Sequence, residues 1–112
     1  MKSNAILDAN GSVIAELDEV RFDSNSNAYL GRIRFVAPPE GLKALLQELD
    51  ECINNQVFVV AAELQDKVDK YNLSARLEDG TTKEICDLNV NKEGGFSFRS
   101  RPAVYPWLET KA

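Results

Sequence analysis

The sequence predicts an α+β protein in which an antiparallel sheet of about six strands carries one or two helices on one face. Turn residues and strand-like alternation occupy the chain before residue 39 and again after residue 72, with three candidate strands in each half. Residues 40–71 lack this pattern, and between Gly41 and Gly80 the chain contains no Gly or Pro. Strands that are grouped apart from helices are typical of this class.

The central region, residues 40–71, has helical periodicity. A single helix of this length would be about 48 Å long, whereas a compact domain of about 100 residues has a radius of gyration of about 13 Å. Asn54-Asn55 is suited to a helix end, so we predict two helices joined near residues 54–56. One long helix shared across a dimer remains an alternative, as does a strand that begins in the β-branched run 57–60. The predicted core positions are Leu46, Leu49, Ile53 and Leu64.

Before the helices, the pattern predicts three strands. Asn10-Gly11 predicts a type I′ hairpin turn between residues 5–9 and 12–17. The apolar phase shifts at Asp18-Glu19, which indicates a β-bulge. A third strand over residues 28–37 ends at Pro38-Pro39.

After the helices, residues 73–78 and 81–90 form a second predicted hairpin around Asp79-Gly80, and residues 96–101 form the last strand. Alternation then assigns side chains to the two faces of the sheet. The buried phase contains five aromatic residues: Phe22, Tyr29, Phe35, Phe96 and Phe98. The outward phase contains Ile14, Leu30, Val36 and Ile85.

The composition predicts one domain over residues 1–101, followed by a tail over residues 102–112 that is rich in Pro and aromatic residues. The net charge of −5 argues against binding to nucleic acid or to an anionic membrane. The N-terminus is too polar for a secretory signal, and no apolar run approaches the ~20 residues of a membrane span. We therefore predict a cytoplasmic protein.

The residues that usually carry catalysis are scarce. The chain has no His, and Cys52 and Cys86 do not stand in a paired spacing. This removes the most frequent general base and the most frequent zinc ligand. The carboxylates near Asp50 lack any Glu-x-x-His motif, so a solvated helix face is the simpler interpretation. No nucleophile, metal or nucleotide motif is found, and no cofactor is predicted.

The arginines provide the candidate interaction face. All six lie on predicted strands, out of phase with the apolar residues, so they should gather on the sheet face opposite the helices. Such a face would suit an anionic partner. The alternative is a solvated face on which the arginines pair with neighbouring carboxylates, including Glu78 and Asp87. The candidate interaction residues, with two aromatic residues of the tail, are Arg32, Arg34, Arg76, Arg99, Tyr105 and Trp107.

The sequence thus favours a small non-enzymatic interaction module whose partner is another protein or a second copy of itself. The alternative is a small-molecule-binding protein or enzyme with a site built from Arg, Tyr and carboxylates, and an anionic ligand belongs to that class. No stretch of the sequence identifies the partner, the ligand or the oligomeric state.

Overall fold

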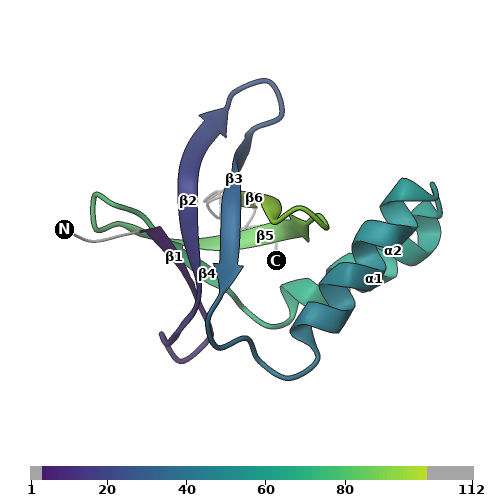
Figure 1. The fold of residues 1–112 in the computed structure, drawn as a ribbon, viewed down its shortest axis with the longest axis horizontal. Coiled ribbons are helices and arrows are strands. Elements are labelled where there is room, and N and C mark those ends of the chain that lie inside the picture. Colours follow the sequence, from purple (N-terminus) through teal and green to yellow (C-terminus); the bar gives the residue numbers. More distant parts are fainter. Residues whose placement is uncertain (1–3, 101–112) are drawn as a thin grey trace, which may run out of the picture.

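The computed structural model describes residues 4–100. Within this range the chain forms six strands with two helices between the third and the fourth strand (Figure 1). The elements are β1 (Asn4–Leu7), β2 (Val13–Asp23), β3 (Ala28–Phe35), α1 (Leu42–Asn54), α2 (Phe58–Asp69), β4 (Ser74–Arg76), β5 (Thr82–Val90) and β6 (Gly95–Ser100). The predicted boundary between a domain and a tail falls on residues 101–112, outside the described residues.

The six strands form a closed antiparallel barrel in the order β1-β2-β3-β6-β5-β4. The prediction of an open sheet with helices packed on one face is therefore wrong. The barrel closes because β1 pairs with β4, with Ile6 opposite Ala75. The helices form an antiparallel hairpin that projects from one side of the barrel (Figure 1), and both helices contact β5.

Three of the hairpin turns share one backbone conformation. At the first, Gly11 donates its N–H to the Asp8 carbonyl and has φ 84°, while Asn10 keeps a negative φ. This is a type I turn followed by a left-handed glycine, and it replaces the predicted type I′ turn. The glycine supplies a positive φ at no steric cost. Gly80 and Gly94 occupy the same position in the other two turns.

The longer strands contain register shifts at three places. Where β2 pairs with β1, Ile6 lies opposite Ala15 and Leu7 opposite Val13, so Ile14 is an extra residue in β2. The predicted bulge at Asp18-Glu19 is confirmed, because the pairing of β2 with β3 shifts between Asp18 and Arg21 and Glu19 has φ 54°. A further bulge interrupts β5 between Cys86 and Asn89, with Asp87 at φ 55°. Bulges increase the local twist of a strand and bend it, which favours closure of a small barrel.

The predicted division into two helices is confirmed. Helix α1 ends in a Schellman motif, in which Val57 donates its N–H to the Cys52 carbonyl and Gln56 donates to Ile53. Gln56 takes the left-handed conformation, with φ 59°, that closes this motif. The chain then turns sharply, and α2 returns toward the barrel alongside α1.

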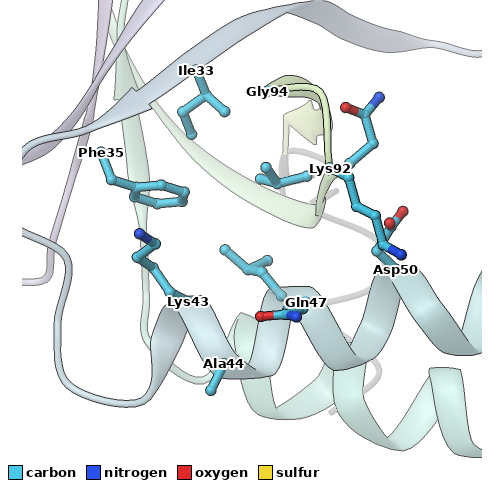
Figure 2. Close-up of a pocket in the computed structure, with 11 residues that line it drawn as sticks. Ile33, Phe35, Lys43, Ala44, Gln47, Asp50, Lys92 and Gly94 are labelled. Atoms are coloured by element: carbon cyan, nitrogen blue, oxygen red, sulfur yellow. The ribbon is translucent and has the colours of Figure 1, made fainter.

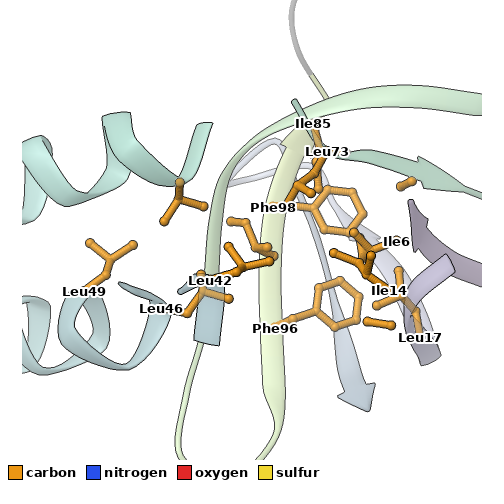
Figure 3. Packing of buried hydrophobic residues seen from close by; sticks show 14 of the residues in the cluster. Ile6, Ile14, Leu17, Leu42, Leu46, Leu49, Leu73, Ile85, Phe96 and Phe98 are labelled. Carbon is orange, nitrogen blue, oxygen red and sulfur yellow. The ribbon is translucent and has the colours of Figure 1, made fainter. Parts of the chain in front are cut away.

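The core fills the barrel and extends between the helices and β5 (Figure 3). Leu46, Leu49 and Leu64 are buried as predicted, and so are Phe96 and Phe98. Other placements are wrong. Ile14 and Ile85 were expected to face outward and are buried, because register shifts at Ile14 in β2 and after Cys86 in β5 change which side chains of these strands point inward. Ile53 and Phe22 were expected inside and are 37% and 51% exposed.

Candidate interaction surface

The structure does not gather the candidate arginines on one face. Arg32 and Arg34 lie on β3, Arg99 on β6 and Arg76 on β4. In the closed barrel two strands separate β3 from β4 in either direction. Because the outer surface of a barrel curves away from strand to strand, side chains on opposite strands point in opposite directions. Tyr105 and Trp107 lie outside the described residues.

Most of these arginines have partners on the barrel itself. Arg34 forms an ion pair with Glu16, and Arg99 Nη1 lies 3.6 Å from Asp87 Oδ2. Arg32 Nη2 donates a 2.7 Å hydrogen bond to the Glu93 carbonyl. Arg76 Nε is buried, and no acceptor among residues 4–100 lies within hydrogen-bond distance of it. These contacts fit the alternative of a solvated surface with cross-strand ion pairs.

Of the seven exposed large apolar side chains among the described residues, five lie at the end of the helical hairpin. This hairpin tip consists of Ile53 and the run Val57-Phe58-Val59-Val60. Phe58 is 63% exposed and Val59 is 78% exposed. Isolated apolar residues on a surface are normal, but five on one short segment form a patch of the kind that marks interaction sites.

Helix geometry explains why these side chains cannot all be buried. Ala61, Leu64 and Val68 form the buried stripe by which α2 packs, at steps of three and four residues. Successive residues of a helix point about 100° apart, so four consecutive apolar residues surround the helix. Phe58 and Val59 fall outside the stripe and face solvent. Folding of the monomer therefore does not account for the apolar character of these two positions.

The hairpin is strongly acidic around this tip. Between Ala44 and Asp66 the chain contains no Lys or Arg. Five carboxylates lie in the same interval: Glu48, Asp50, Glu51, Glu63 and Asp66. An anionic lipid surface or a nucleic acid would be repelled by this charge. A protein surface with an apolar centre and a cationic rim would be complementary to it.

A groove of about 540 Å³ lies at the base of the hairpin, between α1 and the turn that joins β5 to β6 (Figure 2). Its floor is apolar and is formed by Ile33, Phe35, Leu46 and Val90. Three of these four side chains remain partly exposed at the edge of the core. The groove therefore offers apolar surface that folding leaves incompletely covered.

Two lysines stand on the rim of this groove. Lys43 Nζ lies 5.7 Å from the centre of the Phe35 ring, which Figure 2 shows directly above it. Lys92 extends from the β5–β6 turn toward Asp50 of α1 (Figure 2). Neither ammonium group is within 4.0 Å of a carboxylate of the described residues. The rim thus carries two lysines and one carboxylate, Asp50, beside the apolar floor.

Other kinds of site find less support in the described part of the chain. Residues 4–100 hold no group of three or more His, Cys, Asp or Glu side chains placed to bind a metal ion. None of the helices described is long and apolar enough to cross a membrane. In comparisons with known proteins, no family model, no curated protein and no solved structure matches the chain.

Sequence reasoning missed the hairpin tip as a functional surface, although a signal was present. The run of four apolar residues from Val57 to Val60 directly follows the polar segment Asn54-Asn55-Gln56. A helix turn that is apolar on all sides, next to a helix end, cannot bury every side chain against one neighbour. That argument identifies the patch once the break between the helices is placed correctly.

Proposed function

We propose that this protein is a small interaction module that pairs with a second copy of itself through the hairpin tip. The exposure of Phe58 and Val59 at the end of a projecting hairpin is the observation that carries the proposal. Large apolar side chains that are solvent-exposed in the monomer become favourable contacts when a partner covers them. In the pair, each tip inserts into the groove at the base of the hairpin of the other copy.

The two surfaces are complementary in chemistry. The tip presents apolar side chains flanked by carboxylates, including Glu51 and Glu63, which are both exposed. The groove presents an apolar floor with Lys43 and Lys92 on its rim, where the two lysines outnumber the one carboxylate, Asp50. A volume of about 540 Å³ is within the range of pockets that hold drug-sized ligands, so the ring of Phe58 fits. Opposite charges at the edge of an apolar contact favour one orientation over others.

The geometry of the hairpin supports a closed dimer. The groove is lined by α1 from Lys43 to Asp50, and the tip begins at Ile53 near the C-terminal end of the same helix. Lys43 and Ile53 are ten residues apart, which corresponds to about 15 Å along a helix. If two hairpins lie side by side in opposite directions, each tip reaches the groove of the other copy. Such a two-fold arrangement uses both tips and both grooves and does not continue into a filament.

Light scattering at increasing protein concentration tests the proposal. The chain has a mass of 12.5 kDa, and we expect the measured mass to approach twice that value. A variant with Phe58→Ser and Val59→Ser should remain monomeric at every concentration. The matched control is Val36→Ser, because Val36 is 54% exposed and lies outside both the tip and the groove.

Charge reversal tests which surface the tip occupies. Lys43→Glu with Lys92→Glu should weaken pairing, because the groove rim then repels the carboxylates of the tip. Adding Glu51→Lys and Glu63→Lys to the same chain should restore pairing. A wild-type protein that stays monomeric contradicts self-association. A dimer that survives Phe58→Ser and Val59→Ser contradicts the role of the tip.

A further inference from the structure

A polar pocket of about 480 Å³ lies on the outside of the barrel, away from the tip and the groove. It is lined by residues of β3, β5, β6 and α2, and its wall includes Asp87, Asn89, Ser97, Arg99 and Gln65. We propose that this pocket binds a small zwitterion of the α-amino acid type, with its carboxylate on Arg99 and its ammonium group on Asp87 and Asn89. The proposal does not depend on self-association.

The bulge in β5 builds one side of the pocket. Asp87 is held in the left-handed conformation, which non-glycine residues adopt at a cost in energy. Two side chains of α2 hold the bulged backbone in place: Asp69 accepts the N–H of Asp87 at 3.1 Å, and Gln65 Nε2 donates to the Leu88 carbonyl at 3.3 Å. Bulges often direct a side chain toward a functional site, and this one sets Asp87 beside Arg99.

Arg99 and Asp87 form a long ion pair in the pocket. Arg99 Nη1 lies 3.6 Å from Asp87 Oδ2, longer than the 2.7–2.9 Å that is usual for a charge-assisted hydrogen bond. About half of each side chain is exposed. A guanidinium and a carboxylate at this spacing present one positive and one negative group on the same wall. A ligand that carries both charges a few ångströms apart can pair with both groups.

A buried acceptor in the same wall lacks a donor. Asn89 Nδ2 donates to the Asp87 carbonyl at 3.1 Å, which leaves Oδ1 as the acceptor of this amide. Asn89 Oδ1 is buried, and no donor in residues 4–100 lies within hydrogen-bond distance. Buried polar atoms in folded proteins nearly always have a partner. An ammonium group has three N–H donors, so it can bond to Asp87 and, after a small rotation of the amide, to Asn89 as well.

Ser97 and the aliphatic Leu30 complete the pocket beside the charged pair. Ser97 adds a hydroxyl that can donate or accept, and Leu30 adds an apolar surface on β3 for the side chain of the ligand. A ligand with a carboxylate alone would leave Asp87 without a cation, and one with an ammonium group alone would leave Arg99 without an anion. The pocket therefore favours the zwitterion over either half of it.

Nuclear magnetic resonance titration of the full chain with L-serine tests the proposal. We expect saturable shifts at the backbone amides of Asp87 and Leu88 and at the side-chain amide of Asn89. Acetate and methylamine, which carry the two charges separately, should bind at least about tenfold more weakly, because each lacks one charged hydrogen bond. A neutral monosaccharide should cause no saturable shift.

Two charge-neutralising variants locate the contacts. Asp87→Asn keeps the shape of the side chain, and Asn tolerates a positive φ. This variant and Arg99→Gln should each weaken L-serine binding by about tenfold, the effect of one hydrogen bond to a charged group. The matched control is Arg34→Gln, which also removes an exposed arginine that pairs across strands but lies outside the pocket.

Some outcomes would overturn the proposal. They are the absence of saturable shifts at millimolar L-serine, equal binding of acetate or of the monosaccharide, and equal weakening by Arg34→Gln. A water molecule bound to Asn89 Oδ1 in a high-resolution crystal structure soaked with L-serine, with no amino acid present, would also overturn it. Thermal unfolding of each variant checks that a loss of binding is not a loss of folding.

Discussion

The barrel and the helical hairpin share one apolar core, but they differ in how completely neighbouring elements cover their side chains. Each barrel strand is hydrogen-bonded on both edges, and its inward side chains, such as Phe98 at 1% exposure, are fully enclosed. The hairpin packs on β5 near its base and leaves Phe58 and Val59 exposed at its tip. The barrel therefore encloses its apolar side chains, whereas the hairpin leaves apolar side chains uncovered at its tip.

A pair of phenylalanines gives the strongest test of this comparison. Phe98→Ala should lower the free energy of unfolding by about 3–5 kcal/mol, because it leaves a cavity in the barrel. Phe58→Ala removes the same atoms from an exposed position and should change it by less than about 0.5 kcal/mol. Chemical denaturation at low protein concentration measures both without interference from self-association.

Similar losses of unfolding free energy in Phe98→Ala and Phe58→Ala would contradict this difference between the barrel and the hairpin. They would mean that the tip is covered within the monomer. The outcome is informative in either direction, because the side chain removed is identical and only its surroundings differ.

A pair of backbone substitutions gives the next largest effect. A Cβ atom added at Gly31 would lie 2.6 Å from the Asp18 carbonyl oxygen and 2.8 Å from the Phe96 ring. Gly31→Ala should therefore destabilise the barrel by about 1–3 kcal/mol. In the hairpin, Gln56→Gly should instead stabilise the protein by about 1 kcal/mol, since glycine adopts the left-handed conformation at a helix end without strain. Thermal or chemical unfolding measures both changes.

The two substitutions, Gly31→Ala and Gln56→Gly, are expected to change the free energy of unfolding in opposite directions. If Gly31→Ala were harmless, the approach of β3 to the bulge in β2 would be looser than the structure shows. If Gln56→Gly destabilised the protein, the end of α1 would depend on the Gln side chain and not on the backbone conformation.

The smallest effect concerns acid pH and the turns of the barrel. Hydrogen bonds from Ser26 and the Asn25 N–H lower the pKa of Asp23, and those from the Thr81 hydroxyl and N–H lower the pKa of Asp79. A lowered pKa in the folded state stabilises the fold above the unfolded pKa, near 3.8. This stabilisation is lost as the pH falls through the folded pKa. Asp79 is exposed and Asp23 is partly exposed, so solvent screens both groups and the contribution is small.

Asp23→Asn with Asp79→Asn checks this contribution. We expect the double variant to lose less stability than the wild type when the pH is lowered from neutral to about 3. Urea unfolding at the two pH values measures the difference. An identical acid sensitivity in both proteins would show that other carboxyl groups control it.

Features that depend on neighbouring residues were predictable from the sequence. The six strands, the bulge at Asp18-Glu19 and the break near Asn54-Asn55 each follow from a few consecutive residues. Closure of the barrel was not predictable, because it depends on the pairing of Ala5 with Arg76, 71 residues away. The same hairpins are compatible with an open sheet. The burial of Ile14 and Ile85 also depends on register shifts in the pairing with neighbouring strands, which regular alternation does not indicate.

The candidate surfaces were predictable to a lesser degree. Arg99 was singled out from the sequence, and Asp87 was named among the carboxylates expected to pair with the arginines. The β5 bulge that sets Asp87 and Asn89 beside Arg99 was not revealed by alternation. The groove requires the angle between α1 and the β5–β6 turn, which depends on packing alone. The apolar run at the tip was readable in principle, since it depends only on helix geometry and on the position of the break.

The seam between β1 and β4 has a consequence for how the molecule can vary. Asn4 and Glu78 reinforce this seam with two hydrogen bonds, of 3.2 and 2.9 Å, across 74 positions of the chain. The helical hairpin lies entirely within the segment that this seam encloses. Because the entropy of closing a segment changes by only about 0.6 kcal/mol for each doubling of its length, extra helical turns would hardly weaken the seam. The length of the helical hairpin can therefore change over evolutionary time while the barrel stays the same.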